Sequence, residues 1–180
     1  MSHEFEYFAY GSNMLTRRLQ ARTPSARVAA RGYIEGYRLT FDKVSHDGSG
    51  KCNITVTGKS TDIVHGVLFR IDVREKKSLD AAEGLGKGYQ EGRVRVVAES
   101  GVQDAITYIA DRTDSKLVPY DWYKELVTAG AEQHELPKSY IASLRSVEAR
   151  QDTDAARVAE NQAIITEFQR SRVDQQNQPE

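Results

Sequence analysis

The most informative segment of the chain reads Phe5-Glu6-Tyr7-Phe8-Ala9-Tyr10-Gly11-Ser12-Asn13-Met14. Its first half is short and rich in aromatic residues, which predicts a buried strand over residues 5–9. Gly, Ser and Asn follow at once, as is typical of a turn that ends a strand. Residues 14–20 then indicate one or two helical turns. The segment therefore predicts a strand that passes through a tight turn into a helix.

The turn formed by Tyr10, Gly11, Ser12 and Asn13 is a candidate ligand site. A strand-to-helix turn leaves backbone N–H groups without partners at the positive end of the helix, where they attract a carboxylate or an oxyanion. Gly11 would let a ligand approach the backbone, and the next two side chains can hold the turn or donate to the ligand. A plain connection in which Ser12 or Asn13 caps the helix explains the same residues, so both interpretations stay open.

A nucleotide site is not indicated anywhere in the chain. The phosphate-loop pattern Gly-x-x-x-x-Gly-Lys-Ser/Thr is absent, and the glycine cluster at residues 84–88 lacks the preceding strand that such a loop needs. This cluster is more typical of a flexible turn that borders a pocket.

The order of the remaining segments predicts a mixed α/β (α+β) fold around a small curved sheet or β-barrel flanked by helices. Strands are expected at residues 27–30, 37–41, 54–57, 64–71, 94–97 and 105–109, with a mobile polar loop at 45–50. Helices are expected at residues 72–82, with Asp72 as N-cap and Gly84 as the stop, from Tyr120 to about 130–135, and from Pro137 onward. Residues 1–150 are expected to form one domain.

The last thirty residues, 151–180, are expected to form a helical and then disordered tail. This region is charged and rich in Gln, and Val158, Ile165 and Phe168 give it only a weak amphipathic stripe. Disorder is expected from Asp174 to Glu180.

Composition narrows the function classes. The chain has 180 residues, 39% of them hydrophobic and 28% charged, and a formal net charge of −1, so it gives no reason to expect nucleic acid or an anionic membrane as partner. Cys52 is the only cysteine, which excludes an internal disulfide and fits a reducing compartment. Without a signal peptide or an apolar span, we expect a cytoplasmic protein that acts on a small soluble ligand. The oligomeric state stays open, with a homodimer as one option.

Glu83 is the candidate catalytic carboxylate. It lies in the last turn of a predicted helix, where the negative end of the helix dipole disfavours an acidic side chain. Either it is solvent-exposed or it has another role. If Glu83 faces a pocket, burial raises the pKa of its carboxyl group and suits it to proton transfer near neutrality.

Other reactive side chains give weaker patterns. The four histidines His3, His46, His65 and His134 are scattered, without the spacing of a metal site. A Cys52 nucleophile with His46 as its base is disfavoured by the Gly-rich loop between them, and a strand thiol is the simpler interpretation.

Taken together and in this order, three segments resemble the γ-glutamylcyclotransferase-like (AIG2-like) family. The first is Tyr7-Phe8-Ala9-Tyr10-Gly11-Ser12-Asn13-Met14, which is similar to the N-terminal signature of that family. The second is Leu79-Asp80-Ala81-Ala82-Glu83-Gly84, followed by Gly88-Tyr89. The third is Tyr123-Lys124-Glu125, followed by Gly130-Ala131 and Leu136-Pro137. The resemblance covers roughly residues 5–148.

The resemblance implies a small β-barrel flanked by helices, with no metal or organic cofactor, that releases 5-oxoproline from γ-glutamyl compounds. It implies Glu83 as general acid/base, and it places Tyr10, Gly11, Ser12, Asn13 and Met14 around the γ-glutamyl head. Tyr123 would stand near the substrate, and Tyr89 would line the same cavity. A non-catalytic binding module of the same fold is the alternative. The identity of the leaving amine stays open.

Overall fold

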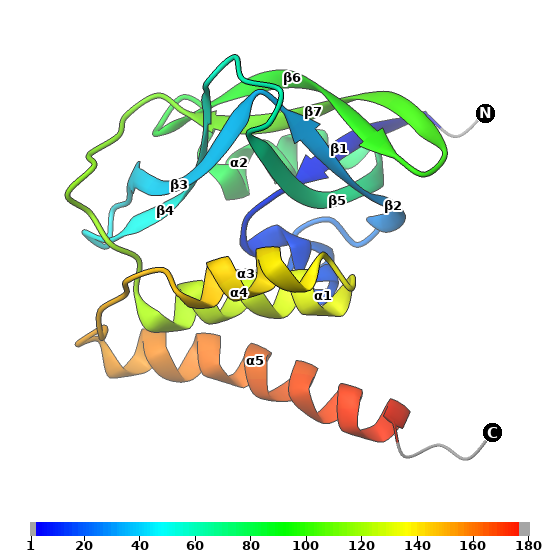
Figure 1. Cartoon of the computed structure of the whole chain (residues 1–180). Helices are drawn as coiled ribbons and strands as arrows, with labels where there is room; N and C mark the ends of the chain where they lie inside the picture. Colours follow the sequence, from blue (N-terminus) through cyan, green and yellow to red (C-terminus); the bar gives the residue numbers. More distant parts are fainter. Residues whose placement is uncertain (1–2, 177–180) are drawn as a thin grey trace.

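A closed five-stranded barrel forms the upper layer of the molecule in the computed structural model, which describes residues 3–176 (Figure 1). Around the barrel, β1 (Glu4–Ala9) is followed by β5 (Ile63–Asp72), β2 (Arg27–Glu35), β6 (Tyr89–Ala98) and β7 (Gly101–Ala110). Neighbouring strands are antiparallel, except that β1 and β7 pair in parallel at Tyr7 and Ile106 and so close the barrel. The predicted mixed fold with a barrel is confirmed.

A separate two-stranded hairpin, β3 (Tyr37–Val44) and β4 (Gly50–Val56), lies beside the barrel. Residues 45–49, expected as part of a mobile loop, form its tight turn. Asp47 holds the turn, because its carboxylate accepts hydrogen bonds from the Ser49 amide at 3.0 Å and from Lys51 Nζ at 2.8 Å. The Tyr120 hydroxyl also donates to the backbone oxygen of Asp47 at 2.9 Å, which ties the hairpin to the helical layer.

The helices cover one side of the barrel (Figure 1). The strand-to-helix turn contains a short 3-10 helix, η1 (Ser12–Met14), which is followed by α1 (Thr16–Gln20). The 3-10 helix packs on α3 (Asp121–Gln133) and on α1. Next to α3 lies α4 (Lys138–Arg145), and α5 (Ala155–Gln176) forms the outermost layer. No helix within residues 3–176 is long and apolar enough to cross a membrane.

Several predicted boundaries were too narrow. β2 continues five residues beyond the predicted end at residue 30, and β6 begins at Tyr89 instead of Val94. Antiparallel pairing continues through polar positions that face solvent, so hydrophobic pattern alone underestimates strand length. The predicted cap at Asp72 is real, but it accepts from the Arg74 amide at 2.9 Å and begins the 3-10 turn η2 (Val73–Glu75). The helix proper, α2 (Lys76–Glu83), ends at Gly84 (φ 70°) as predicted.

The C-terminal segment is more ordered than predicted. Asp174 was expected to begin a disordered end, but α5 continues to Gln176, and residues 177–180 lie outside the described part of the chain. The helix packs on α3, and its own residues Asn161 and Ile165 are buried. These contacts order a segment whose composition suggested a loose tail. The division of the chain at residue 150 into a catalytic domain and a tail stays a prediction.

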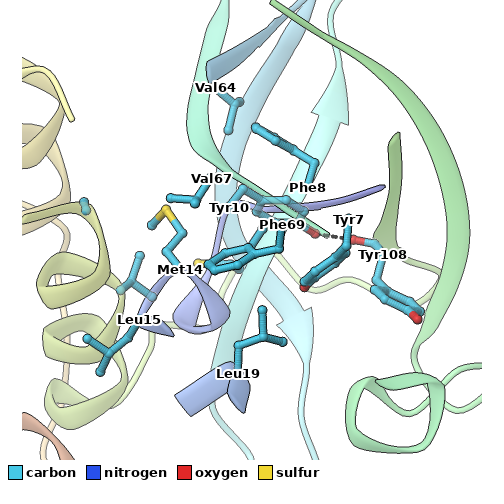
Figure 2. Close-up of a cluster of buried hydrophobic side chains, with 14 of the residues drawn as sticks. Tyr7, Phe8, Tyr10, Met14, Leu15, Leu19, Val64, Val67, Phe69 and Tyr108 are labelled. Atoms are coloured by element: carbon cyan, nitrogen blue, oxygen red, sulfur yellow. Dashed lines mark hydrogen bonds between the residues drawn. The ribbon is translucent and has the colours of Figure 1, made fainter. Parts of the chain in front are cut away.

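Two glycines allow the close packing that positions the turn after β1. A Cβ atom on Gly66 of β5 would lie 2.4 Å from the Ala9 backbone oxygen and 2.6 Å from the Phe8 ring. On α3, a Cβ atom on Gly130 would lie 2.6 Å from the Leu15 nitrogen and 2.7 Å from Met14 Cβ. The first glycine lets β1 press against β5, and the second lets η1 lie directly on α3. Figure 2 shows the buried side chains around the end of β1 and the turn that follows it.

Candidate active site

A narrow cavity lies where β1 runs into η1. The volume that a water-sized sphere can occupy in it is about 30 Å³. Seven of the eight predicted site residues line it, although they come from segments more than 100 positions apart: Tyr10, Gly11, Ser12, Asn13, Glu83, Tyr89 and Tyr123. Tyr7, Cys52 and Tyr108 complete the wall.

Met14 is the exception among the predicted site residues. Its side chain is completely buried in the hydrophobic core, against Gly130 of α3, and does not line the cavity (Figure 2). The motif places the residue next to the turn, but the 3-10 geometry directs its side chain to the opposite side. Met14 therefore supports the turn from behind, and its predicted contact with substrate is not supported by its position.

Glu83 is fixed by two partners. The side-chain amide of Asn13 donates to Glu83 Oε1 at 2.6 Å, and Arg22 donates to the same oxygen at 3.2 Å. Arg22 also donates to Asn13 Oδ1 at 2.7 Å, so the three side chains form a closed triangle. The Glu83 side chain is 15% exposed, which leaves the carboxylate largely sheltered from water. The last turn of α2 is thus joined to the turn after β1.

Opposing effects act on the pKa of Glu83. Burial raises it above the ordinary value for a glutamate, because the charged form loses its hydration. Arg22, the Asn13 hydrogen bond, Arg18 and Lys43 act in the opposite direction and lower it, but burial is the largest effect and the net shift is upward. A carboxyl group of raised pKa in a cavity is suited to accept a proton and to return it near neutrality.

The tyrosine hydroxyls divide into two kinds. Tyr10 donates its proton to the backbone oxygen of Tyr108 (Figure 2), and Tyr89 donates to the backbone oxygen of Cys52 at 2.6 Å. Tyr123 instead accepts from the Cys52 amide at 3.1 Å, and Tyr7 accepts from the Asn13 side chain at 3.1 Å. Because these two hydroxyls act as acceptors, they retain their own protons for a ligand.

The turn itself offers backbone donors. Its internal hydrogen bonds run from the Met14 amide to the Gly11 oxygen at 3.0 Å and from the Leu15 amide to the Ser12 oxygen at 3.3 Å. The amides that precede Met14 therefore have no partner within this helical turn. Arg18 Nε donates to Ser12 Oγ at 3.2 Å, which holds that side chain in place.

Four residues at this site were not predicted. Tyr7 belongs to the quoted signature, and its proximity to the turn was the available signal. Arg22, Cys52 and Tyr108 carry no local motif. Strand pairing brings Cys52 and Tyr108 to the cavity, and the chain reversal after α1 brings Arg22 back to Asn13 and Glu83. Burial raises the pKa of the Cys52 thiol to about 12, so it is a neutral wall residue, as the strand-thiol interpretation holds. Within residues 3–176, no three His, Cys, Asp or Glu side chains are grouped to hold a metal.

Comparison with known proteins shows the family of the chain. The family model of the AIG2-like family matches residues 63–144. The γ-glutamylcyclotransferase of Homo sapiens is 31% identical over 150 residues, covering 80% of this chain and 79% of the human protein. The chain belongs to the γ-glutamylcyclotransferase-like family.

Other members support the assignment. The γ-glutamylcyclotransferase of Mus musculus is 30% identical over 149 residues, with 80% of this chain and 79% of the mouse protein covered. A solved structure of a γ-glutamyl cyclotransferase superposes with a TM-score of 0.82 at 28% identity, over 92% of this chain and 99% of that one. The likeness therefore extends through nearly the whole described fold, and relatives of this chain are enzymes by name.

Proposed function

We propose that this protein is a γ-glutamylcyclotransferase that releases 5-oxoproline and a free amine or amino acid from a γ-glutamyl substrate. The observation that carries the proposal is the sheltered Glu83 carboxylate, held by Asn13 and Arg22 beside the turn after β1. Relatives named for this activity support it. The substrate is a small molecule, and the single cysteine fits a cytoplasmic location.

The chemistry requires few protein groups, because the substrate carries its own nucleophile. Glu83 removes a proton from the α-ammonium group, and the resulting amine attacks the γ-carbonyl carbon to form a five-membered ring. Glu83 then donates the proton to the leaving nitrogen as its bond to the carbonyl carbon breaks. Over the whole reaction the attacking nitrogen loses two protons and the leaving nitrogen gains two, so no external acid or base is consumed. Holding the substrate folded overcomes much of the entropic barrier.

The negative charge that develops on the carbonyl oxygen needs donors. The backbone amides of Gly11, Ser12 and Asn13 are one set, and the hydroxyls of Tyr123 and Tyr7 are the other. Either set can stabilise the oxyanion while the other holds the α-carboxylate of the γ-glutamyl group. In this proposal Tyr10 and Tyr89 serve as walls, because their protons are already committed to backbone oxygens.

The first test is 5-oxoproline release from a panel of γ-glutamyl amino acids, γ-glutamyl amines and glutathione. The proposal predicts catalytic release from at least one of them. If the purified, folded protein releases none, but the same compounds raise its melting temperature, it is a binding module of this fold and the enzymatic proposal is wrong.

A further inference from the structure

Lys43, near the end of β3, is a charged side chain that lies over the ring of Tyr89, a residue of the cavity wall. The residue is only 8% exposed. Its ammonium nitrogen lies 4.7 Å from the centroid of the Tyr89 ring, and Tyr89 lines the cavity. A Cβ atom on Gly88, whose φ is 137°, would lie 3.2 Å from that nitrogen, so the glycine leaves the space that the ammonium group occupies.

Three cationic side chains act on Glu83, and two of them are already engaged. Arg22 donates to Asn13 and to Glu83 itself. Arg18 donates to Ser12 Oγ at 3.2 Å and to Asn161 Oδ1 at 3.3 Å. In the described part of the chain, Lys43 Nζ has neither a hydrogen-bond partner nor a carboxylate oxygen within 4.0 Å.

The charges around Lys43 come from several elements. Glu83 on α2, Asp47 in the β3–β4 turn and Asp111 after β7 attract the ammonium group, and Arg112 repels it. The ammonium group therefore has no direct partner in the described part of the chain, and its positive charge suits an anion supplied by a ligand.

The proposed reaction supplies such an anion. Glu83 protonates the leaving nitrogen, so this nitrogen must lie within hydrogen-bond distance of the Glu83 carboxylate. If the leaving group is an α-amino acid, its carboxylate carbon is two bonds from that nitrogen. Two negative groups then lie a few ångströms apart in a sheltered site, where like charges repel each other. Arg22 already pairs with Glu83, so the carboxylate of the leaving group needs a second cation.

We infer that Lys43 binds a carboxylate on the leaving amine and makes the enzyme discriminate between γ-glutamyl amino acids and γ-glutamyl amines that lack this charge. The inference rests on the proposed function. It assigns to Lys43 the recognition of the leaving group, whereas the turn after β1 recognises the γ-glutamyl head.

The test compares two substrates that differ by one charge, γ-glutamylalanine and γ-glutamylalaninamide. The wild-type enzyme should prefer the acid in kcat/KM. In Lys43→Met, which keeps most of the length of the side chain and removes its charge, the ratio of acid to amide should fall about tenfold or more, mainly through KM for the acid. Lys43→Gln serves as a second variant. Lys77→Met removes an exposed charge from α2 and should leave the ratio as it is in the wild type.

Because each ratio is measured on one enzyme sample, partial unfolding of a variant does not alter it. An unchanged ratio in both Lys43 variants, or no preference for the acid in the wild type, would overturn the assignment of Lys43 alone. Release of 5-oxoproline from neither substrate by the wild type would instead overturn the proposed function, and this inference with it.

Discussion

The Glu83 side chain is largely buried, which disfavours its charged form, but it also accepts hydrogen bonds from Asn13 and Arg22. Burial favours the protonated carboxyl group, and the Arg22 guanidinium and the Asn13 amide favour the carboxylate. A site built in this way keeps both protonation states accessible, which a group that first accepts and then donates a proton needs.

Arg22 should tune the pH dependence of the reaction. In Arg22→Gln the largest opposing charge is lost, so the pKa of Glu83 rises further. Because the base must be ionised in the free enzyme, the acidic limb of the kcat/KM profile should move to higher pH. Arg17→Gln, which removes a cation that is 69% exposed from α1, is the matched control and should leave the limb in place. A limb at the wild-type position in Arg22→Gln would mean that Arg22 has only a structural role.

Two tyrosines that line the same cavity should respond differently to loss of their hydroxyl groups. Tyr123→Phe removes a proton that is available to the ligand and should lower kcat by about tenfold to a hundredfold. Tyr10→Phe leaves the Tyr108 backbone oxygen without its buried donor and should cost mainly stability, about 1–3 kcal/mol. Paired measurements of kcat and of urea unfolding would distinguish the two effects. Equal losses of kcat would show that the division of hydroxyls is wrong.

At the scale of elements, the site depends on how η1 lies on α3. The contact has no room for a side chain, since a Cβ atom on Gly130 would overlap with the backbone of Leu15 and with Met14. The turn that carries Ser12 and Asn13 is therefore supported by a helix more than 100 residues away in the sequence.

Gly130→Ala should disturb stability and catalysis together. We expect a loss of about 1–3 kcal/mol in the free energy of unfolding, because the added methyl group must displace η1 or α3. The same displacement moves Asn13 away from Glu83, so kcat/KM should fall as well. Glu125→Ala, on the exposed face of α3, is the control and should change neither quantity appreciably. Full activity in a destabilised Gly130→Ala protein would show that the turn tolerates this displacement.

The elements also show where sequence patterns are reliable. The turn after β1 and the end of α2 at Gly84 were predicted because local chemistry determines them: a strand followed by Gly-Ser-Asn, and a helix followed by a left-handed glycine. Strand lengths were underestimated, since backbone pairing extends β2 and β6 through segments in which polar residues and glycine interrupt the hydrophobic pattern. Arg22 and Cys52 were not predicted as site residues, because only the folded chain brings Arg22 to Glu83 and Cys52 to the cavity wall.

At the scale of the whole molecule, the barrel and the helical layer meet at the cavity. Strand β1 carries the turn to this boundary, α2 brings Glu83 from the barrel side and α3 brings Tyr123 from the helical side (Figure 1). The outer helix α5 reaches the same region indirectly, since Asn161 accepts from Arg18, which in turn holds Ser12. The sequence did not predict this link to the site, because the hydrophobic residues of α5 show only weak helical periodicity. Packing on α3 orders the helix instead.

The most direct test of Glu83 as the acid/base is 5-oxoproline release by the wild type and by Glu83→Gln, both assayed on a substrate that the wild type accepts. The substitution keeps the size of the side chain and an oxygen that can accept from Asn13, so the melting temperature and its increase on adding substrate should persist. The mechanism predicts a loss of kcat of about a hundredfold or more with substrate binding retained. Near-normal turnover by the folded variant would contradict the central role of Glu83.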